Sequence, residues 1–183
     1  MENKDEVKPS TIATNSSAAS APAPSPKLPA WHPATESLQL GNISLKILKV
    51  VKGKVPLKES FGNDNNESKD ALLTVYVEIK NTSENKKIEY HGWMNRSSII
   101  DDRAELTDNH DNKYRMVSFG STTRVRGMTT FASIYPGKTN PDAIVFEEPV
   151  ESTETLHLLL PGDAVGEEGE FRFEIPASMI KSE

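Results

Sequence analysis

The sequence has no cysteine among its 183 residues. Disulfides, thiolate metal sites and a cysteine nucleophile are therefore excluded, and the fold must be stabilised by its core. The chain also lacks a run of about 18 apolar residues, the length that a membrane-spanning helix needs. Its first residues, which include Glu2, Asp5 and Glu6, form no apolar segment of the kind found in secretion signals. We therefore expect no direct membrane insertion by this chain.

Residues 9–30 consist almost entirely of Ser, Ala, Thr and Pro. A segment of this kind favours polyproline II and has nothing to bury. We interpret residues 1–36 as a disordered linker and residues 37–183 as one folded domain. Such linkers often hold a domain away from an anchor. The chain is expected at the cell envelope, outside the cytoplasm, if it is the soluble part of an anchored protein, and in the cytoplasm otherwise.

Acidic residues outnumber basic ones by 27 to 21, which gives a formal net charge of -6. Sequence-independent nucleic-acid binding requires a concentrated basic face, so we predict no nucleic-acid partner. One basic run is present and consists of Lys46, Lys49, Lys52, Lys54 and Lys58. We interpret it as a solvated strand and turn that faces the acid-rich C-terminal segment.

From Trp31 onward, apolar residues alternate with polar ones between short turn segments, which is typical of β-strands. The clearest strand spans residues 73–79, with its odd-numbered apolar residues facing inward. The pattern predicts a loop over residues 61–69 and a hairpin partner for the clearest strand over residues 88–93. It predicts further strands over residues 38–51, 97–102, 114–119, 128–134, 144–146, 156–160 and 171–175. The expected fold is all-β, an immunoglobulin-like antiparallel β-sandwich of about eight or nine strands.

Several of these segments resemble the telokin-like immunoglobulin-fold domain of bacterial surface proteins and lipoproteins. The strand Val75-Tyr76-Val77-Glu78-Ile79-Lys80-Asn81 fits that family's V-x-V-x-x-K-N pattern. The turn Tyr135-Pro136-Gly137-Lys138 leads into Ile144-Val145-Phe146-Glu147-Glu148-Pro149, which fits its V-F-x-x-P strand. The resemblance covers residues 38–180. It implies a non-enzymatic module tethered outside the cytoplasm, although the chain shows no lipobox.

Residues 132–139 (ASIYPGKT) fit a relaxed phosphate-loop pattern. Pro136 removes one of the N–H groups that would bind phosphate, and Asn140-Pro141 stands where a helix should begin. A type II turn suits the segment better, with Pro136 at its second and Gly137 at its third position. The histidines are scattered without metal-binding spacing and are interpreted as surface residues: His32, His91, His110 and His157. We predict no cofactor.

Calcium is the metal for which the sequence offers the best ligands. The candidates are Asp101, Asp102, Asp108 and Asp111, together with Asn109 and Asn112. Residues 108–112 lack the glycine and the distal glutamate of an EF-hand loop, and a hairpin turn explains them equally well. We predict no metal, with these aspartates as the candidate ligands if one binds.

Residues 120–130 are the best candidate for a partner-binding surface. Arg124 and Arg126 lie there among hydroxyl side chains and glycines, on a connection between strands. Alternatively, Thr-Arg-Val-Arg is the polar face of another strand. Trp93 is either an exposed aromatic anchor for a partner or a core residue.

Together these observations predict a non-catalytic structural or binding module whose partner is a protein or a glycan. No nucleophile and base stand in a known catalytic spacing. An alternative is a hydrolase, such as a carbohydrate-active enzyme, that uses the loop carboxylates of Asp101, Asp102 and Glu105. Adjacent Asp101 and Asp102 would point to opposite faces of a strand, so they cannot themselves form the catalytic pair. A cytoplasmic interaction scaffold is the other alternative.

Overall fold

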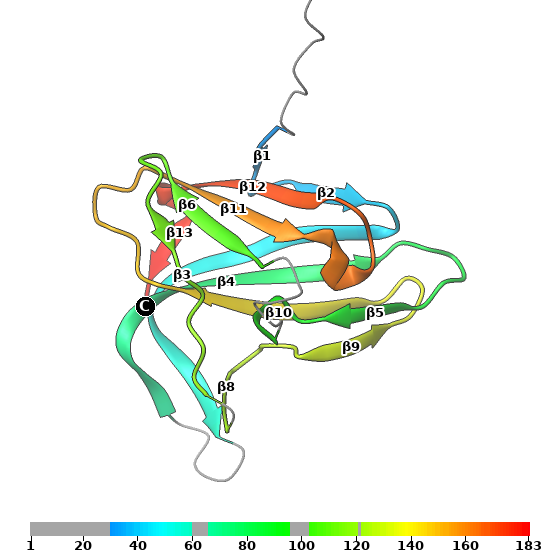
Figure 1. Ribbon diagram of the computed structural model, residues 1–183, viewed down its shortest axis with the longest axis horizontal. Helices are drawn as coiled ribbons and strands as arrows, with labels where there is room; N and C mark the ends of the chain where they lie inside the picture. Colours follow the sequence, from blue (N-terminus) through cyan, green and yellow to red (C-terminus); the bar gives the residue numbers. More distant parts are fainter. Residues whose placement is uncertain (1–29, 60–65, 96–102, 121) are drawn as a thin grey trace, which may run out of the picture.

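The computed structural model describes residues 30–59, 66–95, 103–120 and 122–183, which form the β-sandwich of Figure 1. The strands are β1 (His32–Pro33), β2 (Ser37–Leu40), β3 (Ile43–Glu59), β4 (Asn66–Asn81), β5 (Ile88–His91), β6 (Glu105–Asp108), β7 (Lys113–Tyr114), β8 (Thr123–Val125), β9 (Phe131–Ile134), β10 (Thr139–Phe146), β11 (Thr155–Pro161), β12 (Glu170–Pro176) and β13 (Ile180–Ser182). Short 3-10 turns are η1 (Trp93–Asn95), η2 (Gly162–Val165) and η3 (Ala177–Met179). The predicted all-β sandwich is confirmed. Within the described ranges no helix is long and apolar enough to cross a membrane.

Two large sheets and one ribbon make up the fold. The five-stranded sheet has the order β1-β12-β11-β6-β7. The six-stranded sheet has the order β10-β4-β3-β13, and β2 and β8 also pair with β3. Strands β5 and β9 form a separate two-stranded ribbon. Pairing is antiparallel except between β1 and β12 and between β13 and β3, as expected for a largely antiparallel sandwich.

The main core lies between the two large sheets. Alternate apolar residues of β3 and β4 meet those of β11 and β12 there. The largest fully buried side chains are Trp93, Tyr90, Phe146, Phe171 and Phe173. Full burial of a large apolar side chain stabilises a fold by about 1.5–3 kcal/mol. This core explains how a chain without disulfides folds.

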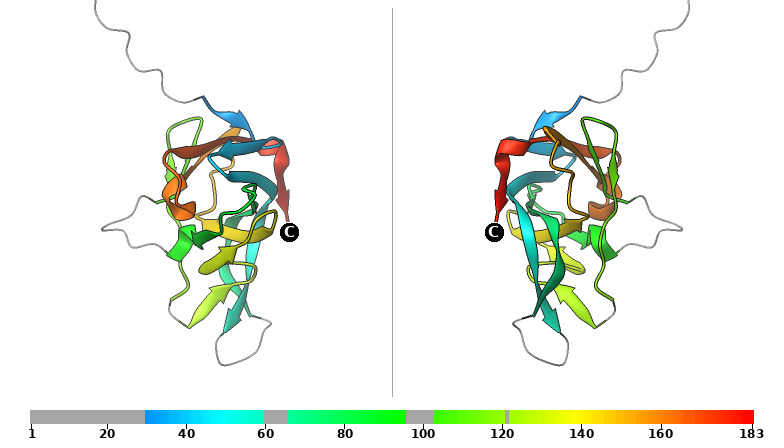
Figure 2. Two further views of the ribbon diagram at one scale, coloured as in Figure 1. Left: turned by 90° about the vertical axis from the view of Figure 1, so that its right-hand side faces the viewer. Right: turned by 90° about the vertical axis from the view of Figure 1, so that its left-hand side faces the viewer.

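The long strands β3 and β4 continue past the main core and carry a second, smaller apolar cluster. Its buried members are Val55, Leu57, Leu72, Val125, Ala143 and Val145. Val125 belongs to β8, which pairs with the end of β3. Figure 1 and both views of Figure 2 show β8 at the end of the molecule opposite β1.

Four strand predictions need correction. Residues 38–51 form two strands, because Gly41 adopts a left-handed φ of 52° and turns the chain between β2 and β3. Residues 66–69 belong to β4 and not to a loop. Residues 88–91 pair with β9, whereas β4 pairs with β3 and β10. Within residues 114–119 only Tyr114 is in a strand, and Met116 makes a single bridge to Phe146. Residues 60–65 and the predicted strand over 97–102 lie outside the described residues.

We predicted that the folded domain starts at Ser37. The described fold already includes β1, which precedes that residue. In β1, His32 lies opposite Phe173 of β12. The ring of Trp31 stacks on His157 with centroids 4.6 Å apart, and the Arg172 guanidinium lies 4.5 Å from the Trp31 ring centroid. These contacts fasten the start of β1 to the five-stranded sheet. Residues 1–29 of the predicted linker lie outside the described residues.

Candidate functional site

The β5–β9 ribbon presents a mixed aromatic and polar face to solvent. Opposite residues of an antiparallel pair share a face, so Glu89 lies beside Ser133 and His91 beside Phe131. Phe131 is 56% exposed, and its ring meets the His91 ring edge-on with centroids 5.2 Å apart. Tyr135, which follows β9, is 61% exposed. We call this surface the ribbon face; it consists of Lys87, Glu89, His91, Phe131, Ser133 and Tyr135.

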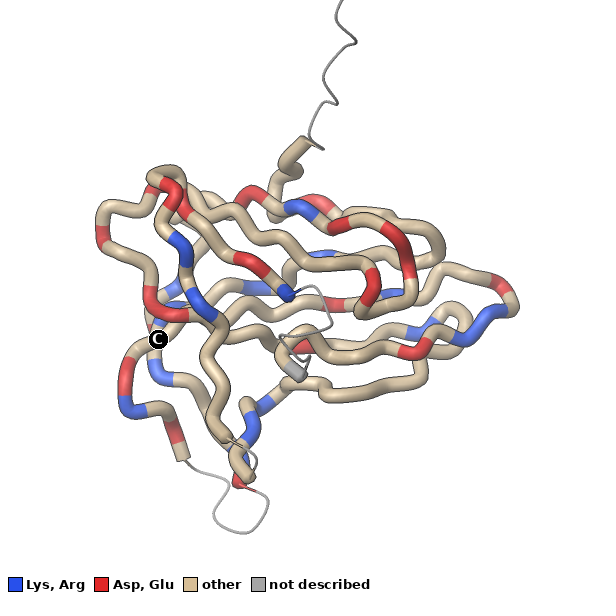
Figure 3. The backbone as a smooth tube through the Cα atoms, viewed as in Figure 1, with Lys and Arg blue, Asp and Glu red and all other residues tan. Residues whose placement is uncertain are grey.

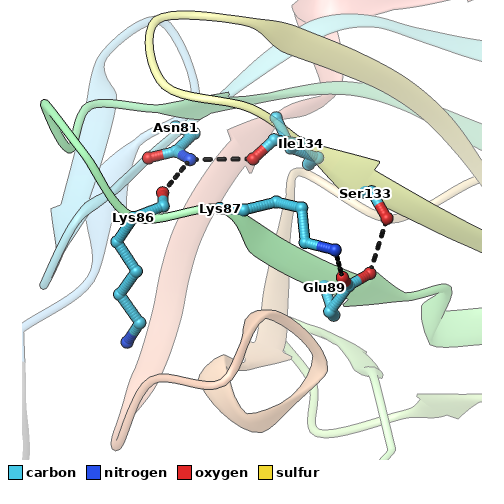
Figure 4. A network of polar contacts seen from close by, with 6 residues as sticks. All are labelled: Asn81, Lys86, Lys87, Glu89, Ser133 and Ile134. Carbon is cyan, nitrogen blue, oxygen red and sulfur yellow. Dashed lines mark hydrogen bonds and ion pairs between the residues drawn. The ribbon is translucent and has the colours of Figure 1, made fainter.

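A small polar network lies on the ribbon face (Figure 4). Glu89 forms an ion pair with Lys87 and accepts a hydrogen bond from the Ser133 hydroxyl at 2.8 Å. The hydrogen bonds from Lys87 and Ser133 lower the pKa of Glu89. The contact with Glu89 raises the pKa of Lys87, and the nearby Tyr135 phenol adds to this effect. The face therefore offers a carboxylate, an ammonium group and a hydroxyl between two exposed aromatic rings.

Asn81, at the end of β4, holds the ribbon in place. Its side chain is fully buried, and Nδ2 donates to the carbonyl oxygens of Lys86 and Ile134, both at 2.8 Å (Figure 4). The Oδ1 atom accepts the backbone N–H and the hydroxyl of Ser83. One amide thus ties the start of β5 to the end of β9.

Tyr135 begins the turn that joins β9 to β10. The Lys138 N–H donates to the Tyr135 carbonyl at 3.0 Å, and Gly137 has a φ of 72°. This geometry is that of the predicted type II turn and not of a phosphate loop. Pro136 restricts the backbone at the second position, which fixes Tyr135 at the end of the ribbon face.

A buried carboxylate beneath the ribbon links it to β10. Asp142 is 1% exposed and accepts hydrogen bonds from the Tyr90 hydroxyl, from the Thr129 N–H at 2.7 Å and from the Ala143 N–H at 2.8 Å. Burial raises the pKa of Asp142 to about 6, although these donors lower it. The Tyr90 hydroxyl also accepts the Trp93 N–H at 3.3 Å. These polar atoms are committed to the fold.

Trp93 is a core residue, and its candidate role as an exposed anchor is wrong. Its side chain is 0% exposed. The indole N–H donates to the Pro161 carbonyl at 3.0 Å, and the ring packs edge-on against Tyr90 with centroids 5.1 Å apart. A partner cannot reach this ring without unfolding the sandwich.

Asp108 organises the turn between β6 and β7. Its carboxylate accepts the N–H groups of His110 and Asn112 at 2.8 and 3.0 Å, and the Asn112 amide at 2.9 Å. It also accepts the hydroxyls of Tyr114 at 2.7 Å and Thr153 at 3.3 Å. Burial alone would raise the pKa of Asp108, but the hydrogen bonds from Asn112, Tyr114 and His110 lower it well below its usual value.

The candidate calcium ligands are not brought together in the described part of the chain. The carboxylate oxygens of Asp108 accept hydrogen bonds from five donors, which leaves no room for a cation. Asp111 is exposed, with a left-handed φ of 61°, and Asp101 and Asp102 lie outside the described residues. Over the described ranges, no group of three or more histidine, aspartate or glutamate side chains could hold a metal ion.

Replacing Asp108 with asparagine is expected to destabilise the protein by about 1–2 kcal/mol, because the new amide would face the donors of Tyr114 and Thr153. The free energy of unfolding, measured with urea at neutral pH, checks this. Asp111→Asn removes the same charge from an exposed turn position that asparagine tolerates, so it should change stability by less than about 0.5 kcal/mol. Equal effects of both substitutions would contradict the role of Asp108.

Arg124 and Arg126 lie at the end of the six-stranded sheet where β8 pairs with β3. Thr123–Val125 is strand β8, as the alternative predicted, with Arg124 facing outward and Val125 buried. Both arginines are exposed, and in the described parts of the chain neither forms an ion pair. The three predicted contact residues therefore do not form one site.

A cleft of about 510 Å³ lies beside η2, at the end of β11. Its charged lining residues are Arg103, Glu105, Asp163, Glu167, Glu168 and Glu170. Glu105, a carboxylate of the hydrolase alternative, is thus in a cleft, while Asp101 and Asp102 lie outside the described residues. Apart from half-buried Glu167, these carboxylates are exposed, whereas a glycosidase acid needs a setting that raises its pKa. The cleft by itself does not support hydrolysis.

No model of a known protein family matches this sequence, and no curated protein does. Among solved structures, the chain is similar to the yjhA protein of Bacillus subtilis, with 13% identity over 79% of this chain and 98% of that chain and a TM-score of 0.51. It also matches the predicted lipoprotein ycdA of Bacillus subtilis, with 16% identity, 80% of this chain, 39% of that chain and a TM-score of 0.49. A third match is an uncharacterised β-sandwich protein of Clostridium difficile, with 14% identity, 84% of this chain, 99% of that chain and a TM-score of 0.42. At 13% identity and a TM-score of 0.51, the similarity to yjhA shows a shared fold.

The ribbon face was not predicted from the sequence. The alternation of Phe131, Ser133 and Tyr135 with Ala132 and Ile134 marks a strand with two unlike faces. We assigned Tyr135 to the turn alone, and nothing in the alternation indicates which face is exposed.

Proposed function

We propose that this protein is a non-catalytic binding module whose ribbon face contacts a glycan. The observation that carries the proposal is the placement of Phe131 and Tyr135. Four large apolar side chains of the described residues are exposed, namely Leu48, Phe131, Tyr135 and Val150. The two aromatic ones both belong to the ribbon face, four residues apart, or about 13 Å along an extended chain.

The chemistry of this face suits a sugar chain better than a protein. A pyranose ring has apolar C–H faces and a rim of hydroxyls, so it needs flat aromatic rings and polar groups side by side. Phe131 and Tyr135 supply the rings, while Glu89, Lys87 and Ser133 supply acceptors and donors. A protein interface would instead centre on a contiguous, desolvated apolar patch.

The wider assignment rests on the fold and the linker. We place the domain in the immunoglobulin-like, telokin-type class on its sequence motifs and on the β-sandwich fold that it shares with a bacterial protein. The Ser/Ala/Pro composition of residues 9–30 favours presentation on a spacer at the bacterial cell envelope. The two buried aspartates, Asp108 and Asp142, use their carboxylates in hydrogen bonds that hold the fold together. This supports a non-catalytic role.

Binding to oligomers of β-1,4-linked glucose and N-acetylglucosamine tests the proposal by titration calorimetry. The Phe131→Ala/Tyr135→Ala variant is expected to lose about tenfold or more in affinity, since each aromatic stacking contact contributes about 0.5–1.5 kcal/mol. The matched control is Leu48→Ala/Val150→Ala, which removes the other two exposed apolar side chains and should leave affinity unchanged. Equal losses in both variants, or binding only to proteins, would contradict the proposal.

A further inference from the structure

The basic run of β3 divides into two parts that have different surroundings. Lys46 forms an ion pair with Glu78 at 2.9 Å, and Lys52 forms one with Glu148 at 2.8 Å. Lys54 and Lys58, further along β3, are exposed and form no ion pair with another described residue. The acid-facing arrangement expected for this run therefore ends before Lys54.

Lys58 and Arg124 occupy directly opposite positions on β3 and β8. Their Cβ atoms are thus about 5 Å apart on one face, a placement of like charges that destabilises a sheet. The next row continues the pattern, because the Arg126 N–H donates to the Pro56 carbonyl at 2.9 Å. The pairing of β3 with β4 is irregular between Lys54 and Pro56, but burial still alternates over this stretch of β3, with Val55 and Leu57 buried and Lys54 and Lys58 exposed, so Lys54 shares this outer face. We call Lys54, Lys58, Arg124 and Arg126 the cationic tip.

The strands at the tip bury their apolar residues on the inner face. Val55, Leu57 and Val125 all belong to the second apolar cluster. On the outer face, the acid in line with these rows is Glu67, which lies across β3 at the row of Pro56. Figure 3 shows Lys and Arg positions at this lower end of the molecule, with acidic positions beside them.

We infer that the cationic tip is a second binding site, for a linear chain of phosphate groups. Charge complementarity identifies the ligand: among the described residues, four cations and one acid, Glu67, lie on this face, while Glu59, which follows Lys58, is by alternation on the opposite one. Guanidinium groups bind phosphate through paired N–H donors. Arg124 lies in β8 and Arg126 directly follows its last residue, so the two are about 7 Å apart along the chain and one extended ligand can contact both. Single-stranded nucleic acid would also need aromatic side chains on which its bases stack.

The position of the tip favours a free polymer over a lipid surface. The tip lies at the end opposite β1, where the described chain begins (Figure 1, Figure 2). A domain carried on its N-terminal segment would therefore direct the tip away from its point of attachment. This inference is independent of the ribbon face, which belongs to different strands.

Labelled linear inorganic polyphosphate tests the inference by fluorescence anisotropy at several salt concentrations. Four contacts predict a slope of about -3 for log K against log salt, and Arg124→Gln/Arg126→Gln should make the slope shallower by about 1.4. At low salt this variant is expected to bind at least about tenfold more weakly. The matched control is Lys80→Gln/Lys86→Gln, which removes two exposed cations elsewhere and should change affinity by less than about twofold.

Three results would overturn the inference: no binding of polyphosphate by the wild type at low salt, equal weakening in both variants, or tip-dependent binding to phosphatidylglycerol vesicles without binding to polyphosphate. Thermal melts of both variants establish that they fold, since the substituted side chains are exposed. Glycan titrations of the same variants should be unchanged. The two binding proposals can therefore fail separately.

Discussion

Replacing Trp93 with alanine is expected to lower the free energy of unfolding by about 3–5 kcal/mol. The substitution empties the largest buried volume of the main core. It also removes the donor to the Pro161 carbonyl and the ring that packs against Tyr90. Because Tyr90 donates to the buried Asp142, the loss reaches the link between the ribbon and β10.

Trp31→Ala is the matched control for that prediction. Trp31 is half-buried and contributes stacking and a cation–π contact, so its loss should cost about 1 kcal/mol. Urea unfolding of both variants gives the comparison. If Trp93→Ala cost no more than Trp31→Ala, Trp93 would not be a core residue.

The second large effect is a pH dependence of stability caused by Asp142. Its pKa is about 6 in the folded protein, compared with 3.8 for an unperturbed aspartate. The folded state therefore binds this proton more tightly than the unfolded state does. The contribution of Asp142 is fully present below about pH 4 and is lost as the pH rises toward 6, by about 3 kcal/mol in total.

Asp142→Asn isolates this contribution, because asparagine cannot ionise and its Oδ1 can still accept the N–H groups of Thr129 and Ala143. Relative to the wild type, the variant should gain about 3 kcal/mol of stability between pH 4 and pH 7. Asp108 does not interfere, since its lowered pKa makes its contribution disappear only below about pH 4. A stability difference that stays constant over this range would show that Asp142 does not titrate there.

Much of the fold follows from alternation in the sequence. Segments such as 73–79, 156–160 and 171–175 bury one face, so their apolar residues repeat every second position. Alternation of apolar and polar residues shows which side of a strand is buried, but it does not show which other strand lies beside it. It therefore could not show that β5 pairs with β9, more than forty residues away, in preference to the preceding strand β4. Strand β8 has three residues, and the alternation of Thr-Arg-Val-Arg predicted it only as an alternative to a connecting loop.

The candidate sites were less predictable. Arg124 and Arg126 stood out as charged residues on a connection, but their pairing with β3 depends on the burial of Val125 in the second cluster. Trp93 gave two opposite interpretations because an indole suits both a core and an interface. The ribbon face required the register of two distant strands, which tertiary packing decides.

A single frame thus supports two unlike surfaces. Asn81 and Asp142 fix the ribbon from below, so its exposed rings keep their spacing. At the end of the molecule opposite β1, β3 and β4 extend beyond the main core, and a second apolar cluster holds β8 against β3. Most residues of both surfaces belong to strands, which place side chains more rigidly than loops do.

Mapping of amide signals by NMR during titration with oligomers of glucose and N-acetylglucosamine tests the central proposal most directly. We predict that signals of residues 87–91 and 131–135 move, that those of residues 123–126 do not, and that the oligomers keep their length throughout. Shifts confined to other strands, no shift with either oligomer, or shortening of the oligomers would contradict a non-catalytic module that binds glycans through its ribbon face.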